Sequence, residues 1–199
     1  MRNREITSFD LDILGEIGNI GAGNAATALS LMLDKKVQLD VPLVKLCNLT
    51  EIADLVGGSE TLKTGIFFGV DKAIKGYISY IFSDEDIDKL CKTFKSQYQI
   101  DEMSIISEIA NIISGAYVGA ISTMINEMID ITPPELGHDM IGALIDSMIS
   151  SIYEAADKTV IIGTALTIEE TAITGFYVLL LEQESLNYLL DYFNVRNVS

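Results

Sequence analysis

The sequence predicts an α/β (α+β) domain that contains one unit twice, with a sheet of about six strands flanked by helices. Two observations carry this prediction. A shift of 92 positions lays one pattern of polar and apolar residues on another, and within each copy helical spacings give way to β-rich runs. The copies span about 8–98 and 101–195. We expect them to form a single domain with pseudo-two-fold symmetry, because units this small seldom bury a core alone.

The duplication shows in residues of unlike chemistry. The shift of 92 positions places Glu16 on Glu108, Asn19 on Asn111 and Pro42 on Pro134. The apolar residues between them keep step, since Ile13, Ile17 and Ile20 fall on Ile105, Ile109 and Ile112. Further along, the shift becomes 99, which indicates that the second copy has gained seven residues.

Each copy begins with a long helix, at about 10–33 and 103–127, where apolar residues recur every three or four positions. An apolar extended segment follows at about 37–47 and 129–135. We next expect a short amphipathic helix, from Leu49 to Val56 in the first copy. In the second copy the inserted residues would lengthen it, from about Gly137 to Tyr153.

Two β-rich runs in each copy are typical of a hairpin, because a short polar or glycine-bearing turn joins them. They are Lys63–Val70 with Lys75–Phe82, and Thr159–Ile168 with Thr174–Leu181. A last helix follows, and its acidic first turn at 83–86 and 182–185 suits the helix dipole. The two long helices are expected on one side of the sheet.

Polar residues form a stripe on the first long helix. Asp12, Glu16 and Asn19 are spaced i, i+4, i+7, so they fall within an arc of roughly 60°. The isoleucines at 13, 17 and 20 fill an adjoining arc that can be buried. Such a stripe on one helix is usually a solvated face. Here the second copy repeats it as Ser104, Glu108 and Asn111, although the copies have diverged elsewhere.

A carboxylate beside a carboxamide can position a water molecule or engage a cation, because asparagine offers both a donor and an acceptor. Neither group is a strong nucleophile. No histidine, cysteine or serine–base pair accompanies the stripe. The pattern therefore favours assisted hydrolysis of an already reactive bond, such as an acyl phosphate, by orientation of the attacking water.

The two stripes, each followed 23 positions after its asparagine by a proline, resemble the paired signature of the CheC phosphatases of bacterial chemotaxis, relatives of CheX and FliY. The resemblance covers nearly the whole chain, including residues 16–27. It implies that the substrate is the aspartyl phosphate of the response regulator CheY. It also implies the roles of the residues: Asn19 and Asn111 would orient the water, and Glu16 and Glu108 would pair with the regulator's lysine.

The resemblance has further implications. Mg²⁺ would belong to the regulator, so no cofactor or metal is expected on this chain. CheD, the receptor deamidase, is an expected partner, and Asp139 on the second short helix resembles its acidic contact residue. Two alternatives remain: a non-catalytic protein that sequesters CheD, or a switch adaptor like FliY. The adaptor is disfavoured because a FliY would carry a further C-terminal module beyond Ser199.

Composition excludes several classes of function. The net charge of −16 argues against a nucleic-acid partner, which would need clustered Lys and Arg. No uninterrupted apolar run approaches the length of a membrane span and no secretory signal is evident, so we expect a soluble, cytoplasmic monomer. The G-x-G-x-x-A pattern at 21–26 lies inside a predicted helix, which argues against a dinucleotide site. Cys47 and Cys91 are expected in the core.

Overall fold

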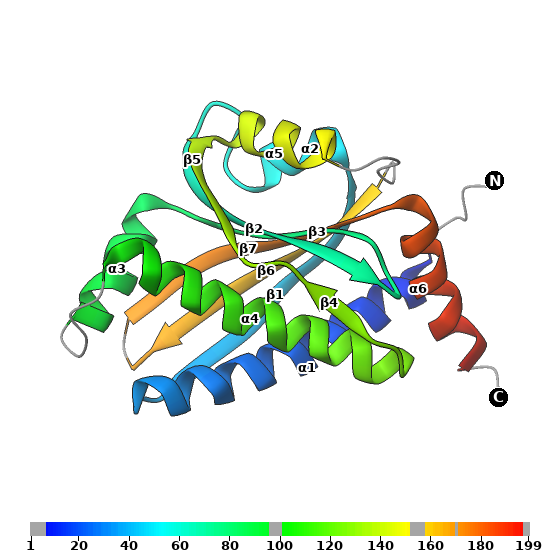
Figure 1. Ribbon diagram of the computed structural model, residues 1–199, viewed down its shortest axis with the longest axis horizontal. Coiled ribbons are helices and arrows are strands. Elements are labelled where there is room, and N and C mark those ends of the chain that lie inside the picture. Colours follow the sequence, from blue (N-terminus) through cyan, green and yellow to red (C-terminus); the bar gives the residue numbers. More distant parts are fainter. Residues whose placement is uncertain (1–6, 96–100, 152–157, 170, 197–199) are drawn as a thin grey trace.

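The computed structural model describes residues 7–95, 101–151, 158–169 and 171–196, and it has three layers. A sheet forms the middle layer (Figure 1). The long helices α1 (Ser8–Leu33) and α4 (Glu102–Ile125) lie side by side on one face. The short helices α2 (Leu49–Leu55) and α5 (Ile141–Ser150) cover the other face. The two ends of the α1/α4 layer are closed by α3 (Asp84–Lys95) and α6 (Gln183–Arg196).

The sheet is antiparallel throughout, and its order is β1-β6-β7-β3-β2-β4, with β5 also paired to β2. Both predicted hairpins are present, as β2 with β3 and as β6 with β7. The strands are β1 (Val37–Asn48), β2 (Leu62–Lys72), β3 (Gly76–Phe82), β4 (Ile129–Ile131), β5 (Glu135–Met140), β6 (Lys158–Ile168) and β7 (Thr171–Leu181).

The two repeats are interlaced in this sheet. The first strand of each repeat pairs with the hairpin of the other, so that β1 lies on β6 while β4 and β5 lie on β2. Leu39 of β1 pairs with Leu166 of β6, and its repeat equivalent Ile131 pairs with Val70 of β2. At the centre, Tyr80 of β3 faces Tyr177 of β7. The predicted fold class, with pseudo-two-fold symmetry and both long helices on one side, is therefore confirmed.

The sheet has seven strands rather than about six, because the extended segment predicted at 129–135 divides into β4 and the start of β5. Pro133 and Pro134 lie at the break, and two residues without an N–H cannot continue a ladder. Thr132 bridges the gap, since its backbone N–H donates to Gly69 O at 2.9 Å and its Oγ1 accepts from Gly69 N at 2.8 Å. In the first repeat, with a single proline, β1 continues through a bulge between Asp40 and Leu43.

The second short helix begins later than predicted. Residues 137–140 belong to β5, and α5 starts at Ile141 and ends at Ser150; the predicted end at Tyr153 lies outside the described residues. The strand forms because the outer edge of β2 has unpaired backbone groups, which β5 satisfies from the pair Leu62–Met140 to the pair Phe67–Glu135.

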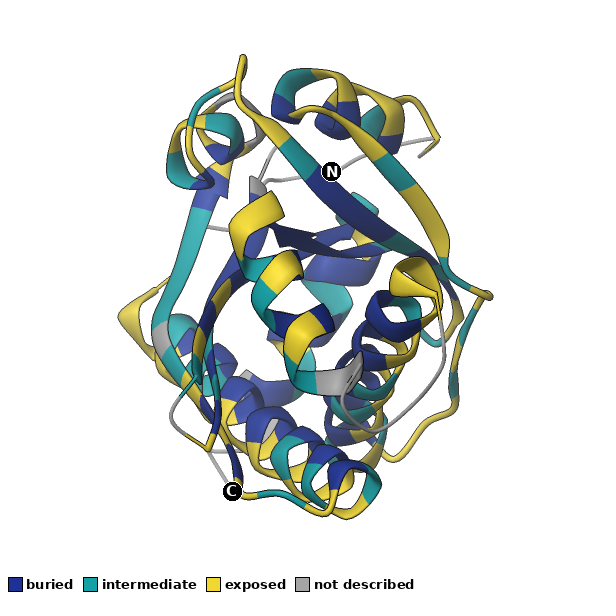
Figure 2. Ribbon diagram, turned by 90° about the vertical axis from the view of Figure 1, so that its left-hand side faces the viewer, coloured by how far each residue is buried: buried dark blue, intermediate teal, exposed yellow. Residues whose placement is uncertain are grey.

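Side chains alternate between the two faces of the sheet and form two cores. Toward α1 and α4 lie Tyr80, Phe82 and Tyr177, and toward α2 and α5 lie Ile81 and Val178. Both long helices turn a buried face to the sheet and an exposed one to solvent (Figure 2). Among the described helices, α4 has the length and apolarity of a membrane span, but more than half of its most apolar stretch is buried inside the protein.

Helices α1 and α4 approach each other closely at Gly21 and Tyr117. A Cβ at position 21 would lie 2.7 Å from Cδ1 and 3.0 Å from Cα of Tyr117. The Tyr117 ring is fixed from its other side, because it stacks on Tyr177 with 4.5 Å between ring centroids. Burial raises the pKa of both tyrosines well above the usual range, and their hydroxyls have no hydrogen-bond partner among the described residues.

Candidate active site

Side-chain caps set the start of both signature helices. At α1, the Thr7 N–H donates to Asp10 Oδ2 at 2.8 Å and the Asp10 N–H donates to Thr7 Oγ1 at 3.3 Å, which is a capping box. At α4, Asp101 Oδ1 accepts from Ser104 N at 3.0 Å, and Asp101 Oδ2 accepts from Ser104 Oγ at 2.5 Å. These hydrogen bonds, that of the Ser104 side chain above all, lower the pKa of Asp101. Each cap helps to fix where its helix begins.

The predicted acid–amide pairs lie on the exposed side of both helices. Glu16 and Asn19 are exposed, whereas Ile17 and Gly18 between them are buried. The same alternation holds at Glu108 and Asn111 around buried Ile109 and Ala110. Among the residues that the structure describes, none hydrogen-bonds to any of these four side chains or forms an ion pair with them. Their polar atoms are therefore available to a partner molecule.

The flanking signature positions differ. Asp12 is exposed and adds a second free carboxylate to the α1 stripe, whereas Ser104 is held by Asp101 as part of the helix cap. Ile20 departs from the predicted buried arc, since it is 38% exposed. Small residues fill the underside of α1 in its place: a Cβ at Gly18 would lie 3.3 Å from Val41 Cγ1, so the helix sits closely on β1.

The second pair borders a groove of about 450 Å³ between α4 and the chain from Pro134 into β5. Its lining consists of Met103, Ser104, Ser107, Glu108, Asn111, Pro134 and Leu136. Two exposed apolar side chains in it, Met103 and Leu136, were not identified from the sequence. Leu136 reaches the groove only because β5 is a strand, so no local pattern could have identified it.

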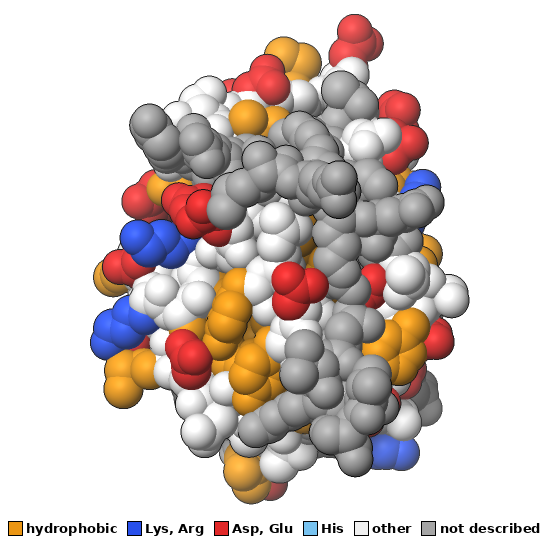
Figure 3. All heavy atoms as spheres, turned by 90° about the vertical axis from the view of Figure 1, so that its right-hand side faces the viewer, with side chains coloured by type: hydrophobic (Ala, Val, Ile, Leu, Met, Phe, Trp, Pro, Cys, Tyr) orange, Lys and Arg blue, Asp and Glu red, His pale blue; other side chains and the backbone are white. Residues whose placement is uncertain are grey.

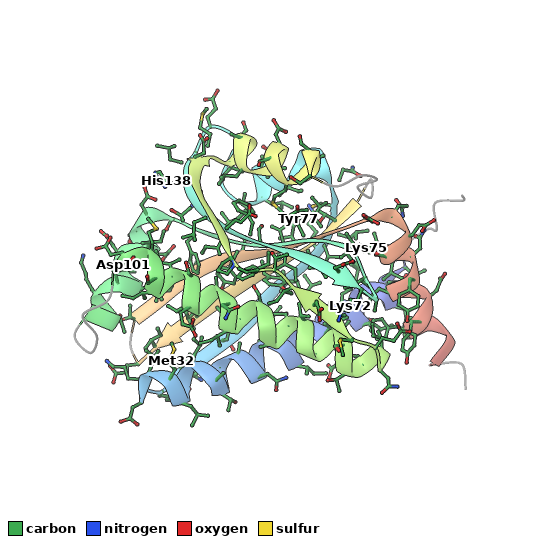
Figure 4. The ribbon with its side chains drawn as sticks, in the orientation of Figure 1. Met32, Lys72, Lys75, Tyr77, Asp101 and His138 are labelled. Carbon is green, nitrogen blue, oxygen red and sulfur yellow. The ribbon has the colours of Figure 1, made fainter. Side chains whose placement is uncertain are left out.

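His138 and Asp139 lie on β5. Figure 4 shows His138 on the same side of the molecule as the cap residue Asp101. His138 Nδ1 lies 3.1 Å from Thr64 Oγ1 and 3.7 Å from Asp84 Oδ1, and it contacts neither acid–amide pair. Asp139, predicted on a helix, is an exposed strand residue whose Oδ1 accepts from Met140 N at 2.7 Å. The contact of Asp139 with CheD therefore stays a prediction, and Asp139 would make this contact from a strand rather than from a helix.

Across the described ranges, no three His, Cys, Asp or Glu side chains come together as a metal site would require. On the side of the molecule that carries α6, acidic side chains are scattered among apolar and uncharged ones, with Lys and Arg at the margins (Figure 3). The described acidic side chains on this side are thus dispersed rather than gathered into one patch.

A family model described as the CheC-like family matches residues 9–46 and 102–138. These two segments contain α4, all of α1 except Ser8, and all four acid–amide residues. The CheY-P phosphatase CheC of Bacillus subtilis is 26% identical over 170 residues, which cover 81% of each chain. The flagellar motor switch phosphatase FliY of the same organism is 28% identical over 178 residues, covering 75% of this chain and 47% of FliY. Among solved structures, FliY of Thermotoga maritima superposes with a TM-score of 0.75 at 18% identity, covering 96% of this chain and 98% of the other.

Proposed function

Because the chain belongs to the CheC-like family, we propose that it is a phosphatase acting on the aspartyl phosphate of CheY, the substrate in the name of its Bacillus subtilis relative. The observation that carries the proposal is the repeated pair of unpartnered side chains, Glu16 with Asn19 and Glu108 with Asn111. Two exposed pairs at equivalent positions of an otherwise diverged duplication indicate a shared task.

The shape around the pairs supports a protein substrate. Enzymes that act on small molecules enclose most of the ligand in a cavity. Here both pairs stand on the outer face of helices, and even the second pair borders only an open groove. An exposed helix face of this kind can enter the active-site cleft of another protein. The partner would then supply the phosphorylated aspartate, its lysine and Mg²⁺.

The pairs would contribute geometry and charge. The Asn19 or Asn111 carboxamide would accept a hydrogen bond from the attacking water and hold it in line with the phosphorus. The water oxygen bonds to phosphorus as the phosphorus–oxygen bond to the aspartate breaks. The aspartate leaves as a carboxylate, and the water's proton ends on inorganic phosphate. Glu16 or Glu108 would pair with the regulator's lysine, which offsets the repulsion between two acidic proteins.

The test measures the decay of phosphorylated cognate CheY with four forms of the chain. They are wild type, Glu16→Ala/Asn19→Ala, Glu108→Ala/Asn111→Ala and the quadruple variant. We expect wild type to accelerate decay and the quadruple variant to return it to the rate of CheY alone. All four side chains are exposed, so the variants should keep the wild-type circular dichroism spectrum. A folded quadruple variant with wild-type turnover would disprove the proposal.

A further inference from the structure

We propose that the second pair, Glu108 with Asn111, is the principal docking point for phosphorylated CheY, and that Met103 and Leu136 select this partner. The two apolar side chains would receive an apolar side chain of the regulator beside its phosphorylated aspartate. The inference rests on the proposed function and goes beyond it, because it ranks the two sites and names the residues that discriminate between partners.

The groove follows from a difference between the repeats. Helix α1 packs along β1, whereas α4 has few contacts with β4, because the chain breaks its strand at Pro133 and Pro134. The space left open is the groove beside Glu108 and Asn111. By the shift of 92 positions, the first-repeat counterparts of Met103 and Leu136 are Leu11 and Val44. Both are only partly exposed, and Val44 packs against the main core.

The exposure of the groove's apolar residues indicates an occupant. Met103 is 49% exposed and Leu136 is 41% exposed, and both line the same groove. Adjacent apolar side chains that remain in water are typical of a binding surface, because their burial by a partner is favourable. They lie next to an acid–amide pair, so the same partner would engage both features.

Charge narrows the chemistry of that occupant. Glu108 is the one charged residue among those that line the groove. A partner surface that presents a lysine next to an apolar side chain would match it, whereas a second carboxylate would be repelled. On α1 the exposed Asp12 adds negative charge near Glu16, which makes the first pair the poorer host for an anionic phosphoryl group.

The experiment uses the full chain with the first pair removed by Glu16→Ala/Asn19→Ala. In this background, Leu136→Thr shortens one apolar side chain of the groove, and Met103→Gln replaces the other by a polar side chain of similar length. Threonine keeps the strand propensity at position 136, and glutamine keeps the helix propensity at position 103. Matched controls are Leu62→Thr on the neighbouring strand and Leu31→Gln on α1, which are 55% and 81% exposed. Steady-state kinetics with phosphorylated cognate CheY, and binding of CheY activated with beryllofluoride, give KM, kcat and Kd.

We expect each groove variant to raise KM and Kd about three- to tenfold, the range for truncating an apolar contact at an interface, with kcat within about twofold. The controls should match the background. The inference is wrong if Leu136→Thr and Met103→Gln behave like their controls, or if Glu16→Ala/Asn19→Ala costs more turnover than Glu108→Ala/Asn111→Ala. Loss of the proposed function is a separate result, namely a wild-type chain that does not accelerate the decay of phosphorylated CheY.

Discussion

Substitution of Gly21 by alanine tests how the two signature helices are held together. The new Cβ would lie 2.7 Å from Cδ1 and 2.9 Å from Cγ of Tyr117. These ring atoms cannot swing aside, because Tyr117 is fully buried and stacked on Tyr177. Overpacking of this kind costs about 1–3 kcal/mol. The gain in helix propensity offsets about 0.5–1 kcal/mol of that cost. We therefore expect Gly21→Ala to lower the free energy of unfolding by about 1 kcal/mol, within a range of about 0–2.5 kcal/mol.

Gly23 provides the matched control. It lies in the same helix two residues further on, and a Cβ there would meet nothing within 4 Å. Gly23→Ala should therefore stabilise the protein by about 0.5–1 kcal/mol. Urea unfolding followed by circular dichroism at 222 nm measures both variants. If Gly21→Ala were as stable as Gly23→Ala, at an unchanged m-value, then the close packing of α1 on Tyr117 would be refuted.

Three further outcomes follow from exposed charge, from burial and from the family resemblance at Asp139. With the second pair removed by Glu108→Ala/Asn111→Ala, Asp12→Ser should raise kcat/KM about two- to fivefold at low salt and less in 0.5 M NaCl. The reason is that surface charge interactions are worth about 0.2–1 kcal/mol and are screened by salt. An unchanged kcat/KM at low salt would contradict the charge argument. Burial, and secondarily Glu51, raises the pKa of the Cys47 thiol to about 11, so iodoacetamide at pH 8 should modify Cys47 only in urea, as mass spectrometry would show. The resemblance to the CheC phosphatases predicts that the chain binds CheD and that Asp139→Lys abolishes this binding in calorimetry, and unchanged affinity would remove CheD as a partner at this residue.

The local sequence pattern predicted much of the fold correctly, because the polarity of each of these elements matches the environment in which the element lies. The run Lys63–Val70 falls inside β2 and Lys75–Phe82 inside β3 to within a residue at its start, since both strands lie between two helical layers and are mostly apolar. The start of the first long helix was placed within two residues, because a three- and four-residue spacing of apolar side chains continues up to the Thr7 cap.

The segment Gly137–Met140 was wrongly predicted as helical, because its conformation is set by pairing with a distant strand rather than by its own sequence. It forms the outer strand of the sheet, so its side chains are mostly exposed and give no alternating apolar signal. What holds it extended is the hydrogen-bonding edge of β2, whose Lys63 pairs with Asp139 although 76 positions separate them in the chain. Local periodicity does not report such long-range pairing.

The positions of the four acid–amide residues on an exposed face were predictable from spacing alone, since a helix repeats its faces regularly. The groove beside the second pair was not. It needs Leu136 brought from β5 to α4, and it depends on how far two elements separate after a chain break. Ile20 also required the structure, because Gly18 and Gly21 let α1 approach its neighbours and displace the isoleucine from the underside.

The exchange of first strands between the repeats has a consequence for the origin of the two sites. Two identical half-length chains could form the same sheet as a strand-exchanged, isologous homodimer, and their two sites would then be equal by symmetry. In such a dimer every substitution appears twice. Once a linker joins the halves into one polypeptide, a proline at 133 or a glycine at 21 can arise in one copy alone. Covalent fusion thus permits a groove to form beside one acid–amide pair and not beside the other.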